Sequence, residues 1–143
     1  MALISLVLVG CATGPTLGTD TVDTVDEPVK LSSSSPANSL LQQAQQARQQ
    51  GQYAAAGRLL ERAISVSRSA ESAVLYREFG ELRLEEGQAR NAEGMFMRAL
   101  RDAPANRRWQ AEIWQLIEQA RQQQGDTKGA QAAQEKRQQL QRL

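Results

Sequence analysis

The chain has 143 residues, with 17 Lys and Arg against 16 Asp and Glu, no His and one Cys. This length supports one modest domain, and a net charge of +1 argues against the clustered basic surface that general nucleic-acid binding requires. Without His, the commonest metal ligand and general base are missing, and a lone Cys forms neither an internal disulfide nor a thiolate metal site. We therefore expect no enzyme, no metal, no cofactor and no nucleic-acid partner.

The first residues resemble the export signal of a bacterial lipoprotein. The apolar run Ala2–Val9 is shorter than the roughly 20 residues of a membrane-spanning helix and is typical of a signal-peptide core. It ends in Leu8-Val9-Gly10-Cys11, which is similar to the lipobox, whose Cys receives diacylglycerol before cleavage on its N-terminal side. The run lacks the usual preceding Lys or Arg. We expect a signal peptide over residues 1–10 and lipidation at Cys11, including palmitate; the alternative is a small buried Cys.

Residues 11–36 are expected to form a disordered tether. They are rich in Gly, Pro and Ser, with too few large apolar residues to offset the entropy cost of ordering. Their charged residues are Asp20, Asp23, Asp26 and Glu27 against Lys30 alone. Enterobacterial lipoproteins with Asp after the lipidated Cys stay in the inner membrane. Because Ala12 stands there instead, the resemblance implies a lipid anchor in the outer membrane and a domain facing the periplasm.

Three glycines divide the rest of the chain into helix pairs. From Ala37 onward the composition favours helix, and Gly51, Gly87 and Gly125 each separate a polar stretch from a fresh apolar helical pattern. Such glycines end helices in the left-handed region. They lie 36 and 38 residues apart, a period typical of stacked helix-turn-helix units. The sequence therefore predicts three units, over about residues 37–70, 73–105 and 109–143.

The residues around these glycines resemble the tetratricopeptide repeat. In the middle unit the matching residues are Tyr76, Phe79, Gly80, Ala92, Phe96, Ala99, Leu100 and Pro104. In the first unit they are Tyr53, Ala56, Leu60, Ala63 and Ile64. The resemblance covers residues 37–142 and implies an all-α fold, a short right-handed α-solenoid of about three helix pairs. The alternative is a Gln-rich bundle or coiled coil, but the glycine breaks and the lack of a sustained heptad count against it.

Departures from the repeat pattern lie mainly in the third unit. There Glu118 replaces a small residue, and Gln134 and Arg137 replace apolar ones, so we expect the last helix to be a solubilising cap. The units exceed the usual repeat length by two and four residues. We expect this surplus in residues 67–72 and 105–111, as longer turns or as an added helical turn.

Tetratricopeptide repeats bind an extended or helical peptide in a concave groove lined by the first helix of each pair. The groove positions of the motif fall on Asn38, Leu41, Gln45, Arg48, Gln49, Val74, Arg77, Glu81, Leu84, Glu85, Glu112, Gln115, Gln119, Gln122 and Gln123. We expect an amide and mixed-charge surface with Leu41, Val74 and Leu84 as its apolar points. Amide side chains satisfy a peptide backbone, although Gln is also an ordinary solvated helix former. The carboxylate clamp of chaperone-binding members is absent, with Leu41 and Gln45 at two of its positions.

The resemblance implies a membrane-anchored periplasmic scaffold that docks a protein or peptide partner into an envelope complex. Lipoproteins of this kind serve as adaptors for cell-wall enzymes, in outer-membrane assembly, or as pilus and secretion accessories, and the residues do not choose among these. The alternative is a structural subunit that forms a homo-oligomer or completes a larger helical assembly through Trp109, Ile113 and Trp114. That reading requires these side chains to be exposed.

Basic residues gather in the folded region. Four of them lie near Trp109 in the sequence: Arg98, Arg101, Arg107 and Arg108. One interpretation is that they contact an acidic partner or phospholipid head groups. The other is that they form a solvated face and that the Trp side chain is folded inward. Residues 37–143 carry 16 Lys and Arg against 12 Asp and Glu, whereas the tether is acidic. This opposition allows a weak association between the two parts.

Overall fold

Gly51, Gly87 and Gly125 have φ angles of 72°, 72° and 74° in the computed structural model, which describes residues 29–103 and 105–142. This left-handed conformation is costly for residues with a Cβ atom. At Gly51 the next amide, Gln52 N, donates to Ala47 O at 2.9 Å, and equivalent bonds of 2.8 and 2.9 Å follow the other two glycines. Each bond closes a helix and turns the chain back. The predicted helix-ending role of these glycines is confirmed.

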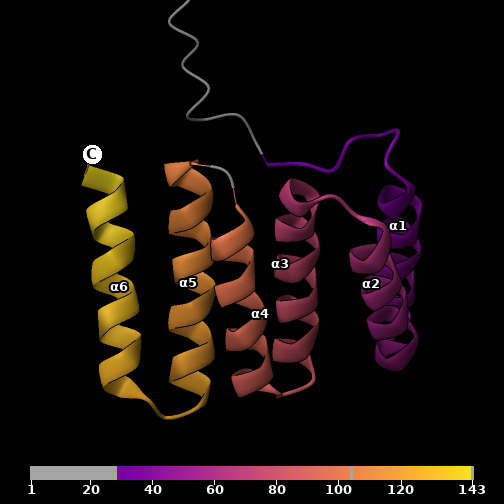
Figure 1. Ribbon diagram of the computed structural model, residues 1–143. Helices are drawn as coiled ribbons and strands as arrows, with labels where there is room; N and C mark the ends of the chain where they lie inside the picture. The colour runs from indigo at the N-terminus through magenta and orange to yellow at the C-terminus, as the bar shows by residue number, and fades with distance from the viewer. Residues whose placement is uncertain (1–28, 104, 143) are drawn as a thin grey trace, which may run out of the picture.

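The described residues form six helices and no strand (Figure 1). They are α1 (Pro36–Gln49), α2 (Tyr53–Val66), α3 (Ser69–Glu85), α4 (Ala89–Asp102), α5 (Arg107–Gln123) and α6 (Thr127–Arg142). The closest packing is within the pairs α1–α2, α3–α4 and α5–α6. Figure 1 shows the pairs following one another, from α1 and α2 at the right to α6 at the left. The predicted α-solenoid is confirmed.

The surplus residues of the longer units lie in helix rather than in loops. Helices α3 and α5 each have 17 residues, against 14 in α1, α2 and α4. The expected surplus regions, 67–72 and 105–111, contain the starts of these two helices. Asn106 accepts a 2.8 Å bond at Oδ1 from Trp109 N and so caps the start of α5. The first helices of the second and third pairs, α3 and α5, are therefore longer by about one turn than α1.

Two apolar clusters form the core, and α3 contributes to both. The first-unit cluster consists of Ala37, Leu41, Ala44, Ala47, Ala56, Leu60, Ala63, Leu75, Phe79 and Leu82. The second cluster is built around Phe96, Trp109, Ile113 and Ile117, and Val74 of α3 packs against both clusters. Small Ala residues let the helix axes approach, and Leu, Ile or Phe fill the space between them. This sharing joins the first unit to the other two.

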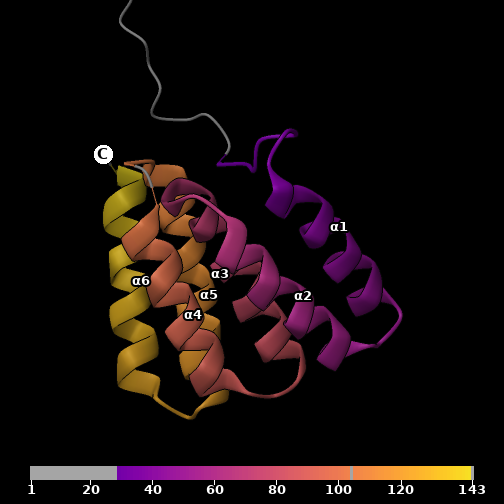
Figure 2. The same ribbon diagram turned by 45° about the vertical axis from the view of Figure 1, so that its right-hand side comes forward.

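Residues 29–35, which we name the strap, lie against the repeats. Val29 packs on the second cluster and Leu31 on the first-unit cluster, while Ser35 Oγ donates to Glu71 Oε2 at 3.0 Å. In Figure 1 and Figure 2 the strap crosses the end of the solenoid where α3 begins. The tether was expected to run to Pro36; its last residues instead contact the domain, because two apolar side chains find partners there. The expected signal peptide, Cys11 and the rest of the tether lie outside the described residues.

A buried glycine in α2 provides a test of the packing between the first two units. A Cβ atom at Gly57 would lie 3.8 Å from both Leu82 Cδ2 and Phe79 Cε2, which is ordinary contact. Gly57→Ala is therefore expected to raise the free energy of unfolding by about 1 kcal/mol, because Ala favours helix over Gly by that amount. Urea denaturation followed by circular dichroism measures this gain. A lower midpoint would show that α2 and α3 pack more tightly than described.

Candidate protein-binding surface

The predicted groove residues lie on α1, α3 and α5, the first helices of the three pairs. The half-buried ones are Asn38, Gln45, Arg48, Val74, Arg77, Glu81 and Glu112, and the exposed ones are Gln49, Glu85, Gln115, Gln119, Gln122 and Gln123. Leu41 and Leu84 differ from the expectation, because they are only 7% and 9% exposed and belong to the core clusters. They support the surface from beneath instead of offering apolar points on it. The role of the others in binding stays a prediction.

Arg48 lies among three glutamates that α3 presents one helical turn apart. Its Nε and Nη2 donate to the two carboxylate oxygens of Glu85 at 2.9 and 2.6 Å, a bidentate pair. Its Nη1 lies 3.4 Å from Glu81 Oε2 and 3.5 Å from Glu78 Oε2. Gln45 Nε2 adds a 3.2 Å bond to Glu78 Oε1. These contacts connect α1 to α3 along the groove face.

The ion pairs continue from α3 to α5. Arg77 Nε lies 3.0 Å from Glu81 Oε1, and its Nη1 lies 3.8 Å from Glu112 Oε2. Glu112 in turn lies 3.5 Å from Arg108 Nε, and the Arg77 guanidinium lies 5.3 Å from the centre of the Trp109 ring. A continuous charged ladder therefore crosses all three first helices.

The α1–α3 part of the ladder surrounds an open hollow of about 650 Å³. The hollow is lined by Gln45, Arg48, Gln49, Tyr53, Glu78, Glu81 and Glu85. Three carboxylates and one guanidinium line the hollow, and Arg77 beside it also pairs with Glu81, so negative charge remains in excess by about one unit. The amide and mixed-charge character expected for the groove is present, and its negative charge is concentrated between the first two units.

The positions of Glu78 and Glu85 shift their pKa values in opposite directions. Burial raises the pKa of Glu78, and repulsion from Glu81 adds to this effect. The hydrogen bonds from Arg48 lower the pKa of Glu85 and, reciprocally, raise the pKa of Arg48. Glu78 thus carries a charge that the fold disfavours, whereas Glu85 carries one that the fold stabilises.

Glu78→Gln is expected to stabilise the domain at pH 7, by less than about 1 kcal/mol. The charged Glu78 side chain lowers the stability of the fold at pH values above its raised pKa in the folded state. This cost disappears below its pKa in the unfolded state, so the stability gained by Glu78→Gln should vanish toward pH 3. The amide that replaces the carboxylate keeps a hydrogen-bond acceptor for Gln45. Denaturation midpoints at several pH values measure the difference between the variant and the natural chain.

Glu85→Gln is the matched control. The lowered pKa of Glu85 stabilises the fold above the unfolded pKa, and this contribution is lost as the pH falls through the folded pKa. The control should therefore lose stability at pH 7 and match the natural chain at low pH. The same sign for both variants at pH 7 would contradict this account of the ladder.

Sequence reasoning left two residues, Glu78 and Tyr53, out of the groove. Neither was among the groove positions of the motif, and Tyr53 was matched to the repeat only as a residue of the first unit. The spacing of Glu78, Glu81 and Glu85, at three and four residues, places them on one stripe of α3 and was a usable signal. Tyr53 had no such signal, because its place in the hollow follows from the turn at Gly51.

The third unit replaces apolar packing with charge. Glu118 Oε2 lies 3.3 Å from Arg137 Nη2, so two of the three departures from the repeat pattern pair with each other across α5 and α6. Arg121 Nε lies 2.7 Å from Glu93 Oε1 and joins α5 to α4. Of α6, Ala130 and Ala133 are buried, and most of the rest is exposed. Helix α6 has the polar outer face of a terminal cap.

The apolar face expected to mediate self-association is covered. Trp109 and Ile113 are 4% and 0% exposed, and Trp114 is half-buried against the second cluster. This corrects the premise of the homo-oligomer alternative: these side chains fill the space between the second and third units.

Within the basic cluster, Arg101 pairs with Asp102 at 3.1 Å and Arg98 lies over the Tyr76 ring. Trp109 is folded inward, as one of the two readings of this cluster predicted.

Other kinds of site are not found in the part of the chain that the structure describes. In residues 29–103 and 105–142 no three His, Cys, Asp or Glu side chains are placed to hold a metal ion. Within the same ranges, no helix has both the length and the apolar character needed to cross a membrane. The groove face is the surface on which the predicted binding residues converge.

This architecture is that of a tetratricopeptide-like helical-repeat domain. The Sgt2 TPR domain from Aspergillus fumigatus matches with a TM-score of 0.64 and 19% identity, over 81% of this chain and 72% of that chain. The globular C-terminal domain of P. aeruginosa LpoP matches with a TM-score of 0.68 and 33% identity, over 76% of this chain and 99% of that chain. The chain belongs to the LpoP family. No protein-family model and no curated protein matches it.

Proposed function

We propose that this protein is a lipid-anchored scaffold of the outer membrane that docks one partner protein into a periplasmic envelope complex through its groove face. The observation that carries the proposal is the charged ladder on α1, α3 and α5 around an open hollow. Exposed amide and carboxylate groups there offer hydrogen bonds to a peptide backbone and to its charged side chains. The partner is a protein that serves cell-wall synthesis or hydrolysis, outer-membrane assembly, or pilus or secretion function.

The anchor in this proposal comes from the sequence before the described residues. Cys11 closes a lipobox-like motif, and several acyl chains hold a protein on a membrane essentially permanently. The similarity to LpoP supports the arrangement, because the matched part is described as a globular C-terminal domain and so follows other sequence in that protein. Here too the helical repeats occupy the C-terminal part of the chain.

The proposed scaffold has no catalytic step. Glu85 and Glu86, the adjacent carboxylates of the groove region, pair with different arginines: Glu85 with Arg48, and Glu86 with Arg83 at 2.6 Å. They therefore do not act together as a general acid and base on one substrate. The Ser residues of the chain have no His to activate them.

Photo-crosslinking in intact cells tests the docking surface. A photoreactive residue replaces Gln49 or Gln119, which are exposed on α1 and α5, and the control replaces Glu135, which is exposed on α6. We expect one dominant protein adduct at both groove positions that is absent at the control position. Adducts of equal yield at all three positions, or none at the groove positions, would overturn the proposal.

Cys11→Ser is expected to abolish metabolic labelling with palmitate, because the thioether that carries diacylglycerol cannot form. The labelled natural chain is the positive control. The helical circular dichroism of the variant should be unchanged, since Cys11 lies well before the first residue of α1 in the sequence. Normal labelling of the variant would disprove lipidation at Cys11. The docking surface is tested separately, by the crosslinking experiment.

A further inference from the structure

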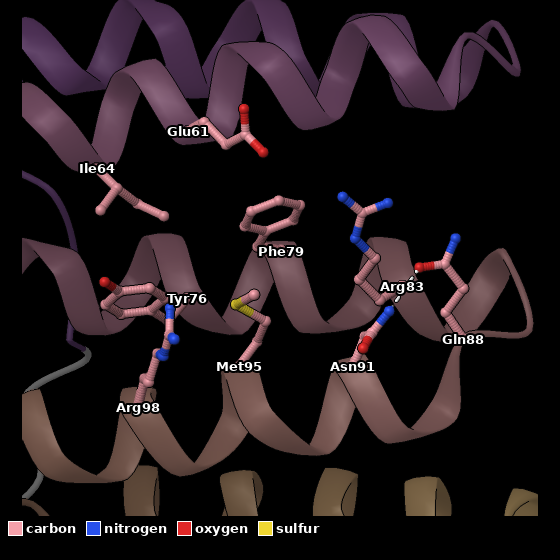
Figure 3. A pocket seen from close by; sticks show the side chains of 9 residues that line it. All are labelled: Glu61, Ile64, Tyr76, Phe79, Arg83, Gln88, Asn91, Met95 and Arg98. Atoms are coloured by element: carbon pink, nitrogen blue, oxygen red, sulfur yellow. Dashed lines mark hydrogen bonds between the residues drawn. The ribbon is translucent and has the colours of Figure 1, made fainter.

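A second hollow lies on the opposite face of α3, between α2 and α4 (Figure 3). It measures about 400 Å³ and is lined by Glu61, Ile64, Tyr76, Phe79, Arg83, Gln88, Asn91, Met95 and Arg98. We name it the α2–α4 groove. Tyr76, Phe79 and Arg83 are spaced by three and four residues, about half a turn around α3 from the charged ladder. The two hollows are therefore separate surfaces.

The groove has an apolar floor and two arginines on its rim, of which Arg83 already pairs with Glu86 at 2.6 Å. Figure 3 shows Phe79 rising from α3 toward α2, with Met95 of α4 beside it. The Arg83 guanidinium lies 4.8 Å from the centre of the Phe79 ring, and that of Arg98 lies 5.6 Å from the centre of the Tyr76 ring. Among the lining residues Glu61 is the single carboxylate. This chemistry suits a ligand with apolar side chains flanked by carboxylates.

The chain itself contains such a ligand in residues 17–27, which we name the acidic segment. Its apolar residues are Leu17, Val22 and Val25, and its acidic residues are Asp20, Asp23, Asp26 and Glu27. No Lys or Arg occurs within it. Apolar and acidic side chains thus alternate along a stretch whose charge is opposite to that of Arg98 on the groove rim.

The strap, which follows this segment in the sequence, lies at one end of the groove. Ile64 and Arg98 lie within about one helical turn of the ends of α2 and α4, at Val66 and Asp102. The strap crosses the same end, because Ser35 contacts Glu71 in the first turn of α3. Eleven extended residues span about 36 Å, which exceeds the roughly 21 Å length of α4. A segment of this length is therefore long enough to span the groove.

We propose that the α2–α4 groove binds the chain's own acidic segment. The short connection through Val29 keeps the segment at an effective concentration in the millimolar range, so that even a weak site is filled. The chain between Cys11 and the domain spans about 60 Å when it is fully extended. Binding of the acidic segment to the groove shortens this span. A ligand that displaces the segment would lengthen the reach of the domain from its anchor.

The test uses the chain from residue 11 onward with Cys11→Ser, which keeps every described residue and the acidic segment. A photoreactive residue replaces Met95 in the groove, and Glu135 on α6 is the control position. We expect an intramolecular adduct that maps to residues 17–27 from position 95 alone. Its yield should not change on tenfold dilution and should fall about tenfold when the four acidic residues become Asn or Gln.

Two further results decide between this occupant and others. The methyl NMR signals of Ile64 and Met95 should shift in the neutralised variant, while that of Ile117 should not, and Arg98→Glu should lower the adduct yield from position 95. Adducts of twice the chain mass, with a yield that falls on dilution, would show that a second copy of the chain occupies the groove instead of the acidic segment. An absence of adducts and of shifts would overturn the proposal, and unchanged circular dichroism would show that both variants remain folded.

Discussion

Phe96→Ala is expected to lower the free energy of unfolding by about 3–5 kcal/mol. Phe96 is fully buried in the second cluster, and its ring contacts α3 directly at Gly80. Truncation removes the transfer free energy of the ring and leaves a cavity that rigid helices do not fill. Because small domains are stable by only about 5–15 kcal/mol, this loss is a large share of the total. Urea denaturation followed by helical circular dichroism measures it.

Met97→Ala is the matched control for Phe96→Ala. Met97 is the next residue of α4 but is 45% exposed, so its truncation should change stability by less than about 0.5 kcal/mol. Equal midpoints for the two variants would show that Phe96 does not fill the space between α3 and α4.

Gly80→Ala is expected to destabilise the domain by about 1–3 kcal/mol, against the intrinsic preference of helices for Ala. A Cβ atom at Gly80 would lie 2.6 Å from Phe96 Cδ1 and 2.8 Å from Phe96 Cζ, well inside contact distance. Either the ring or α4 must move, and the packed cluster resists both. Gly57→Ala, the same substitution at a buried helical glycine with room for a methyl group, should have the opposite sign.

A double-mutant cycle separates the steric cause from other effects of Gly80→Ala. Combining Gly80→Ala with Phe96→Leu removes the ring that the new methyl group meets. The combined loss should be smaller than the sum of the two separate losses. Additive losses would place the cost of Gly80→Ala elsewhere in α3.

Helix α3 connects the two surfaces for which we propose roles. One face presents Glu78, Glu81 and Glu85 to Arg48, and the opposite face presents Tyr76 and Phe79 to the α2–α4 groove. The buried charge of Glu78 lowers stability at neutral pH. A residue that the fold disfavours is typical of surfaces kept for binding. A cationic group of the partner near Glu78 would relieve this cost.

The sequence by itself determined the features that depend on neighbouring residues. Gly51, Gly87 and Gly125 were recognisable because a helix end in the left-handed region favours glycine wherever the rest of the chain lies. Phe96 and the Ala residues near it were recognisable because helical spacing places them on one face. Together these local signals sufficed for the helix pairs, the repeat period and the solenoid.

Only the tertiary structure decided which groups meet across units. Arg48 and Glu85 are 37 residues apart and form the shortest contact of the ladder, and Glu118 pairs with Arg137 on the next helix. The burial of Leu41 and Trp109, and the packing of Val29 on the repeats, likewise depend on how successive pairs stack. Helical periodicity gives the direction of a side chain around its own axis, but not the position and tilt of the helix that faces it. Contacts and hollows between helices depend on this position and tilt.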